Sequence, residues 1–259
     1  MHELLSGFLS NESTFGRLMG RAWIIIAANL MFCIFSLPVV TIGASWAALS
    51  HVMLKTLRSD GDIRPIAEFW RGFKSNFKQA TIVWIVAVLL VVLGYFNVRI
   101  CEQADGFIAL MKYGVYALGI ILAIVLIYLF PVMAAFANSI PNLIKNSLYF
   151  AMHKPWKILI LAFFTIFPLY LTYTDPDWKP LYGFIWVTFG FGAIAMLTAT
   201  LLLPEFRPYL PLVDASGAFV LDDDGNPVMP GQENASAGAP GTAEKTDAEI
   251  QEEMRKLGM

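Results

Sequence analysis

The sequence predicts an all-α protein, a polytopic bundle of about six apolar helical segments embedded in a membrane. Hydrophobic residues make up 57% of the 259 residues and charged residues only 15%, whereas soluble globular chains carry roughly 25% charged residues. Several runs also approach the roughly 20 apolar residues with which a helix crosses a bilayer core. We therefore expect the lipid bilayer to be a main partner of this chain.

The first apolar region has no Asp, Glu, Lys or Arg between Arg21 and Lys55, and a stretch of this length is too long for one crossing. Proline removes a backbone donor and disfavours helix at the residue before it, and glycine tolerates the conformations of a turn. We predict a helix break over Pro38, Val39, Val40, Thr41, Ile42 and Gly43. The break separates a segment at residues 22–37 from a shorter one at 42–54, which is either a short crossing or a re-entrant arm covered by protein.

Four further crossings follow, at residues 80–98, 113–137, 158–173 and 181–203. Each run lacks Asp, Glu, Lys and Arg and is flanked by charged residues. A buried helix of a soluble protein rarely lacks charge over this length, so the membrane interpretation is favoured.

Charge placement predicts the orientation. If the first region is a hairpin, most basic residues fall on one face, which the positive-inside rule makes cytoplasmic; they are Arg17, Arg21, Lys55, Arg58, Arg64, Arg71, Lys74, Lys78, Lys145, Lys154 and Lys157. The opposite face keeps Arg99, Lys112 and Lys179. Both termini are then expected in the cytoplasm.

The loop before residues 80–98 contains aromatic residues at helical spacing, with lysines elsewhere on the helical wheel. This pattern predicts a basic amphipathic helix that lies in the membrane interface or docks a cytoplasmic partner. Its residues are Phe69, Trp70, Phe73, Lys74, Phe77 and Lys78. From residue 213 the composition changes to Gly, Pro, Ala, Asp and Glu, so we divide the chain into a membrane domain at 1–212 and a disordered cytoplasmic tail at 213–259. A capping pattern at Thr246 predicts a short terminal helix in that tail.

No catalytic, cofactor-binding or metal-binding residue is predicted. The sequence lacks nucleophile, zinc-protease and phosphate-loop motifs, and its three histidines lie on dissimilar segments. An enzyme is therefore the least favoured class. Nucleic-acid binding is not expected either, because membrane orientation already explains the basic residues. The uncharged polar groups inside the segments, such as Asn29 and Thr41, are expected to join helices.

The break also carries a resemblance. Asn29, followed by Leu37-Pro-Val-Val-Thr-Ile-Gly43 and Ala47-Ala-Leu49, resembles the hallmark of the YesL-like family of bacterial membrane proteins. Phe73-Lys-Ser-Asn-Phe-Lys-Gln-Ala80 and Leu203-Pro-Glu-Phe206 are similar to later parts of that family, whereas the acidic tail departs from it. The family has no established activity, so the resemblance implies no catalytic residue.

What the resemblance implies is context, because such proteins are often encoded beside carbohydrate uptake systems. It favours an accessory or assembly subunit of a carbohydrate ABC transporter in the bacterial plasma membrane. The alternative is a stand-alone channel or facilitator for a small neutral solute, which the helix break and the nearby polar residues would allow.

Overall fold

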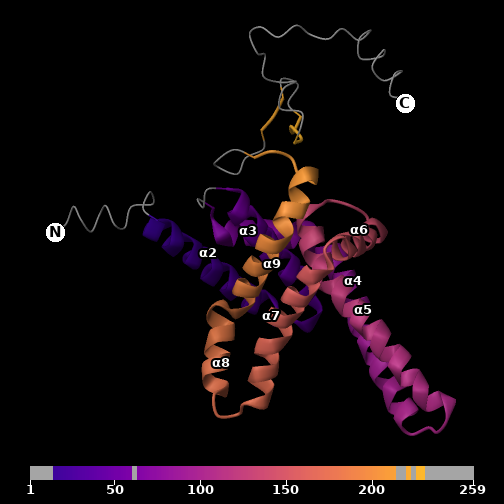
Figure 1. Ribbon diagram of the computed structural model, residues 1–259. Coiled ribbons are helices and arrows are strands. Elements are labelled where there is room, and N and C mark those ends of the chain that lie inside the picture. The colour runs from indigo at the N-terminus through magenta and orange to yellow at the C-terminus, as the bar shows by residue number, and fades with distance from the viewer. Residues whose placement is uncertain (1–13, 60–62, 214–219, 223–225, 231–259) are drawn as a thin grey trace, which may run out of the picture.

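The computed structural model describes residues 14–59, 63–213, 220–222 and 226–230, and over this part the protein is helical (Figure 1). Five of its helical stretches are long and apolar enough to cross a membrane. The main helices are α2 (Thr14–Phe35), α3 (Ile42–Arg58), α4 (Pro65–Glu102), α5 (Phe107–Ala135), α6 (Ile140–His153), α7 (Pro155–Thr174), α8 (Lys179–Ile185) and α9 (Phe191–Phe206). The predicted fold class is confirmed.

The predicted helix break is present between α2 and α3. Helix α2 ends at Phe35, a 3-10 turn η1 (Val39–Thr41) follows, and α3 begins at Ile42. The Thr41 hydroxyl lies 2.6 Å from the Phe35 carbonyl oxygen and 2.7 Å from that of Pro38, so it satisfies carbonyls left free where α2 ends. Gly43 then allows close packing, because a Cβ there would lie 2.6 Å from the Trp84 Cβ.

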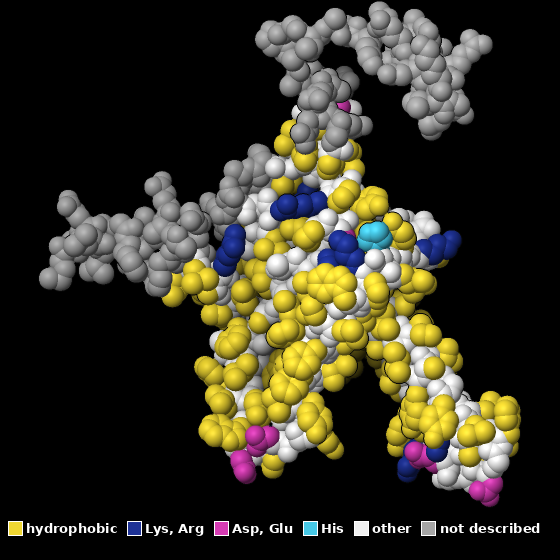
Figure 2. All heavy atoms as spheres, in the orientation of Figure 1, with side chains coloured by type: hydrophobic (Ala, Val, Ile, Leu, Met, Phe, Trp, Pro, Cys, Tyr) yellow, Lys and Arg dark blue, Asp and Glu magenta, His cyan; other side chains and the backbone are white. Residues whose placement is uncertain are grey.

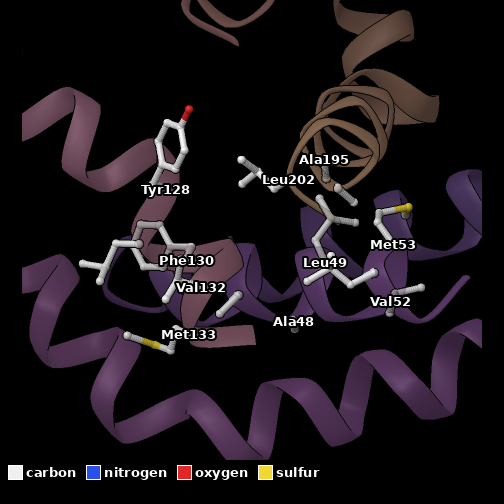
Figure 3. Close-up of a cluster of buried hydrophobic side chains, with 14 of the residues drawn as sticks. Ala48, Leu49, Val52, Met53, Tyr128, Phe130, Val132, Met133, Ala195 and Leu202 are labelled. Atoms are coloured by element: carbon white, nitrogen blue, oxygen red, sulfur yellow. The ribbon is translucent and has the colours of Figure 1, made fainter. Parts of the chain in front are cut away.

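Helix α3 is the core of the molecule rather than a lipid-exposed crossing. Eleven of its 17 residues are buried, and it is not among the five candidate spans. Its side chains Ala48, Leu49, Val52 and Met53 pack with side chains of α5 and α9 (Figure 3).

The α2–α3 break lies beside the middle of the long helices. Trp84 Nε1 donates to the Val39 carbonyl at 2.8 Å. From Trp84, helix α4 continues to Glu102, about 27 Å further along its axis. On the other side, Phe32 contacts Phe191 at a ring distance of 4.9 Å. The break therefore stops well short of the far ends of the molecule, as a re-entrant hairpin would.

Two helical arms diverge below this core (Figure 1). The α4–α5 arm consists of α4 and α5, and the α7–α9 arm consists of α7, α8, a π-helical segment η2 (Trp186–Gly190) and α9. The turns between α4 and α5 and between α7 and α8 lie at the two lower tips, whereas α6 lies at the opposite end.

Charged side chains separate along the long direction of the molecule. Figure 2 shows most Lys and Arg over the upper body and acidic groups at the tips of both arms, with further Lys or Arg side chains at the tip of the α4–α5 arm. The turns at these tips contain Glu102, Asp105, Asp175 and Asp177. Arg99 pairs locally with Glu102, with Nη1 and Oε2 3.2 Å apart. We call the upper face the basic end; its grouping of charges agrees with the predicted hairpin.

Two sequence expectations need correction in detail. The amphipathic helix and the crossing at residues 80–98 are one continuous helix, α4, because no proline follows Pro65 within it. The last crossing also starts earlier than predicted, at Lys179, and contains the π-helical segment. The residues 231–259, with the predicted terminal helix, lie outside the described residues. Part of the segment before them is ordered by backbone hydrogen bonds, including Leu212 N to Val228 O at 2.8 Å.

Candidate functional site

A cavity of about 240 Å³ lies where the two arms meet, and we call it the apex cavity. Its walls come from the helix break, both arms and α9, and they include Gly43, Trp46, Trp84, Phe130, Phe191 and Ile194. Nearly all of this surface is apolar, and the Thr198 hydroxyl on its wall is already bound to the Ile194 carbonyl at 2.8 Å. Below it, the space-filling view shows open space between the arms (Figure 2).

A second cavity of about 470 Å³ lies within the α7–α9 arm, and we call it the arm cavity. It shares Ile194 with the apex cavity and is lined by Phe164, Pro168, Trp186 and Phe189. Trp186 Nε1 donates to the Thr172 hydroxyl at 2.9 Å, so the polar tips at this wall pair with each other. The two cavities adjoin at Ile194, and we call them together the recess; its apolar walls suit hydrocarbon surfaces.

Asn29 holds the π-helical segment beside these cavities. Its side-chain amide donates to the carbonyls of Trp186 at 3.0 Å and Val187 at 2.7 Å, and its Oδ1 accepts from Gly192 N–H at 2.8 Å. A π-helical turn leaves backbone groups without their usual partners, and one buried amide satisfies three of them here. Asn29 thus joins helices, as expected from the sequence. Gly192 allows α9 to approach α2 this closely, because a Cβ there would lie 2.9 Å from the Ile25 backbone.

Several glycines in the arms face open space. A Cβ added at Gly114 or Gly119 on α5, or at Gly183 on α8, would meet no atom of the described residues within 4 Å outside the local helix backbone. Glycine costs a helix about 1 kcal/mol relative to alanine, and no described residue from elsewhere packs against these three positions. In membranes, small residues let a second helix approach closely.

A buried ion pair joins two helices of the α7–α9 arm, α7 and α9, near the basic end. Lys157 Nζ on α7 lies 2.6 Å from Glu205 Oε1 on α9, and the two side chains are 6% and 4% exposed. The same ammonium donates to the Leu201 carbonyl. The Tyr128 hydroxyl on α5 is buried without a hydrogen bond and interacts electrostatically with Glu205. Sequence reasoning treated both charges as flanks of the crossings and missed their pairing.

Glu68 ties α3 to α4 at the basic end. Its carboxylate lies 3.0 Å from Lys55 Nζ, 2.8 Å from Arg71 Nη2 and 3.4 Å from His51 Nε2. Burial lowers the pKa of the His51 imidazole, although Glu68 acts in the opposite direction. Among the described residues no group of three His, Cys, Asp or Glu side chains could hold a metal ion. The cluster therefore connects helices.

The structure divides the predicted interface helix into two faces. Phe69 and Phe73 are buried and pack against Phe35 of α2, with ring distances of 5.8 and 5.0 Å. Trp70, Phe77, Lys74 and Lys78 stay exposed, and Lys74 Nζ lies 4.9 Å above the Trp70 ring. A surface for lipid or a partner would therefore consist of the second group alone.

The residues of the break divide in the same way. Pro38, Val39 and Val40 are exposed, Thr41 and Ile42 are half-buried, and Gly43 is buried. Ile42 and Gly43 lie on the wall of the apex cavity, where they meet Trp46, Trp84 and Phe130. The break and the cavity are thus parts of one site.

Comparison with known proteins finds that part of the chain is similar to one family. The family described as "Protein of unknown function, DUF624" matches residues 25–98, which contain the break, α3 and most of α4. The uncharacterized protein YesL of Bacillus subtilis (strain 168) is 25% identical over 137 residues, or 52% of this chain and 65% of that protein. The uncharacterized protein YteU of the same organism is 23% identical over 107 residues, or 41% and 48% of the two chains.

These alignments span less than two thirds of either relative's length. No solved structure matches the chain. The similarity carries no activity, because the family and both relatives are described as uncharacterized or of unknown function.

Proposed function

We propose that this chain, a helical membrane protein of the YesL-like family of unknown function, is an accessory or assembly subunit that holds a transmembrane helix of a partner protein between its arms. The observation that carries the proposal is the apolar recess formed by the apex cavity and the arm cavity.

The occupant is a hydrocarbon surface and not a water-soluble solute. A solute path needs polar groups that replace the solute's hydration shell, whereas the walls of the recess are almost wholly apolar. Three polar side chains on these walls, Thr172, Trp186 and Thr198, already make hydrogen bonds within the protein, and Thr165 adds one hydroxyl to the apex cavity. This favours the accessory subunit over the channel or facilitator.

A helix fits better than loose lipid because the arms are poorly packed on their own. In α4 and in α7, only 11% of the most apolar 18-residue window is buried by the rest of the chain. Apolar side chains gain little by leaving lipid for protein, so membrane helices associate through close van der Waals packing at small residues. Gly119 on one arm and Gly183 on the other offer such positions with open space above them.

The partner is a permease subunit of a carbohydrate ABC transporter, as the family resemblance implies. The positive-inside rule puts the basic end in the cytoplasm, together with both termini and the exposed face formed by Trp70, Lys74, Phe77 and Lys78. The cytoplasmic parts of a transporter would contact that face. The recess would then contact the partner within the membrane, and this face would contact the same partner in the cytoplasm.

Blocking the recess tests the proposal. Ile194→Trp narrows the recess where the two cavities adjoin, and Gly119→Leu places a side chain at the open glycine, whose Cβ position has no neighbour within 4 Å among the described residues outside the local helix backbone. We expect recovery of a permease subunit after crosslinking and gentle solubilisation to fall at least about tenfold in each variant, and sugar uptake to fall with it.

Leu18→Trp is the matched control, because Leu18 is 64% exposed on α2, away from the recess. Recovery of a permease or ATPase subunit that is the same in all three variants would overturn the proposal. So would the absence of any such subunit together with unchanged sugar uptake.

A further inference from the structure

A pocket of about 520 Å³ opens at the basic end, apart from the recess between the arms. It lies where α3 ends at Arg58 and where the 3-10 turn η3 (Arg207–Tyr209) follows α9. The remaining walls are apolar and include Leu57, Pro208, Leu210 and Leu212. No acidic side chain among the described residues lines it.

Arg58 is a cation without a counter-ion in this part of the chain. Its guanidinium is half-buried and donates to the Pro211 carbonyl, a neutral acceptor. None of the ion pairs between described residues includes Arg58 or Arg207. Burial lowers the pKa of the Arg58 guanidinium, but an arginine stays charged in proteins. A desolvated guanidinium with free donors is stabilised by an anion.

The position of the pocket defines the kind of anion. Helix α9 forms the last part of a candidate membrane crossing, Lys179–Tyr209, and Arg207 lies near the end of that stretch, so the pocket lies at the level of the lipid headgroups. A guanidinium fork matches the geometry of a phosphate, and apolar walls beside it suit the glycerol and first methylenes of a lipid. Arg58 and Arg207 also lie at helix C-termini, where the helix dipole stabilises a cation even without a bound anion. Anion binding requires more than this, namely that the two guanidiniums act on one ligand.

We propose that Arg58, Arg207 and the apolar walls between them form a binding site for a phosphate group, supplied by an anionic phospholipid. The proposal is independent of the recess and of the partner assigned to it. A free phosphate ion shares the recognised chemistry, and the two sources are separated by experiment.

The experiment uses the full chain purified in an uncharged detergent. Native mass spectrometry and thermal unfolding are recorded with dioctanoyl phosphatidylglycerol, dioctanoyl phosphatidylcholine or inorganic phosphate. We expect phosphatidylglycerol to bind and stabilise the protein more than phosphatidylcholine does. Arg207→Gln, a change at an exposed side chain that leaves the fold intact, is expected to weaken that binding about tenfold, as for the loss of one charged hydrogen bond.

Lys145→Gln is the control, since Lys145 is exposed on α6 outside the pocket, and we expect it to bind like the wild type. If inorganic phosphate binds as tightly as phosphatidylglycerol and Arg207→Gln weakens both equally, the pocket is a phosphate site whose ligand is the free ion and not a lipid. Equal binding of the two lipids would overturn the proposal. An equal loss in Lys145→Gln, or none in Arg207→Gln, would overturn it too, because diffuse surface charge would then explain the effect.

Discussion

Replacing Lys157 with Met leaves the Glu205 carboxylate buried without its counter-ion. The two side chains are 6% and 4% exposed and their charged atoms lie 2.6 Å apart. At an effective dielectric constant near 20, such a pair attracts with about 6 kcal/mol, and part of this offsets the desolvation of both ions. Removing one partner of a buried pair costs about 3–5 kcal/mol. We expect Lys157→Met to lower the free energy of unfolding by that amount.

Removing both charges separates this cost from packing. In the double variant Lys157→Met with Glu205→Leu, no buried charge is left unpaired, so we expect stability to return to within about 1 kcal/mol of the wild type. Unfolding in mixed micelles of mild detergent and dodecyl sulfate, followed by circular dichroism, measures all variants. Lys145→Met is the control, because Lys145 is exposed and no ion pair among described residues includes it.

Two results would refute this reasoning. A loss below about 1 kcal/mol in Lys157→Met would mean that the pair is solvated and worth little, as surface pairs are. A double variant less stable than either single one would show that the ions do not act on each other.

Three other changes test the fold. Gly43→Val should destabilise the protein by about 2 kcal/mol or more, since even a Cβ would lie 2.6 Å from the Trp84 Cβ; thermal unfolding measures it, and a neutral result would show that α3 and α4 are not in close contact. Asn29→Leu removes three hydrogen bonds around the π-helical segment, and we expect a loss of about 2 kcal/mol; the same assay serves, with loss near zero counting against the geometry. In intact cells, a cysteine at Lys112 should react with a membrane-impermeant maleimide and one at Lys55 should be protected, whereas labelling of Lys55→Cys from outside would contradict the hairpin.

The elements with strong local signals were predictable from the sequence. The break at Pro38 and Gly43 was predicted within a few residues, because proline and glycine act on their own backbone and need no distant partner. Long charge-free runs likewise gave the crossings, since the bilayer imposes one length on all of them.

Features that depend on distant contacts were not predictable. In the sequence, Lys157 and Glu205 each look like a charged residue at the end of a membrane crossing. Only the packing of α7 against α9 shows that they are buried together. The π-helical segment has no local signal, because its stability comes from Asn29 on another helix. For the aromatic helix, periodicity gave the apolar face but could not tell that Phe35 covers Phe69 and Phe73.

Photo-crosslinking from the wall of the recess tests whether a transmembrane helix of a partner lies against it. A benzophenone amino acid replaces Ile194, which lines both cavities, or Trp23, which is 60% exposed on α2 and serves as control. After irradiation in cells, crosslinked peptides are sequenced by mass spectrometry. We predict that Ile194 yields adducts with one transmembrane helix of an ABC permease subunit and that Trp23 does not. Adducts with lipid alone at Ile194, or the same proteins captured at both positions, would contradict the account.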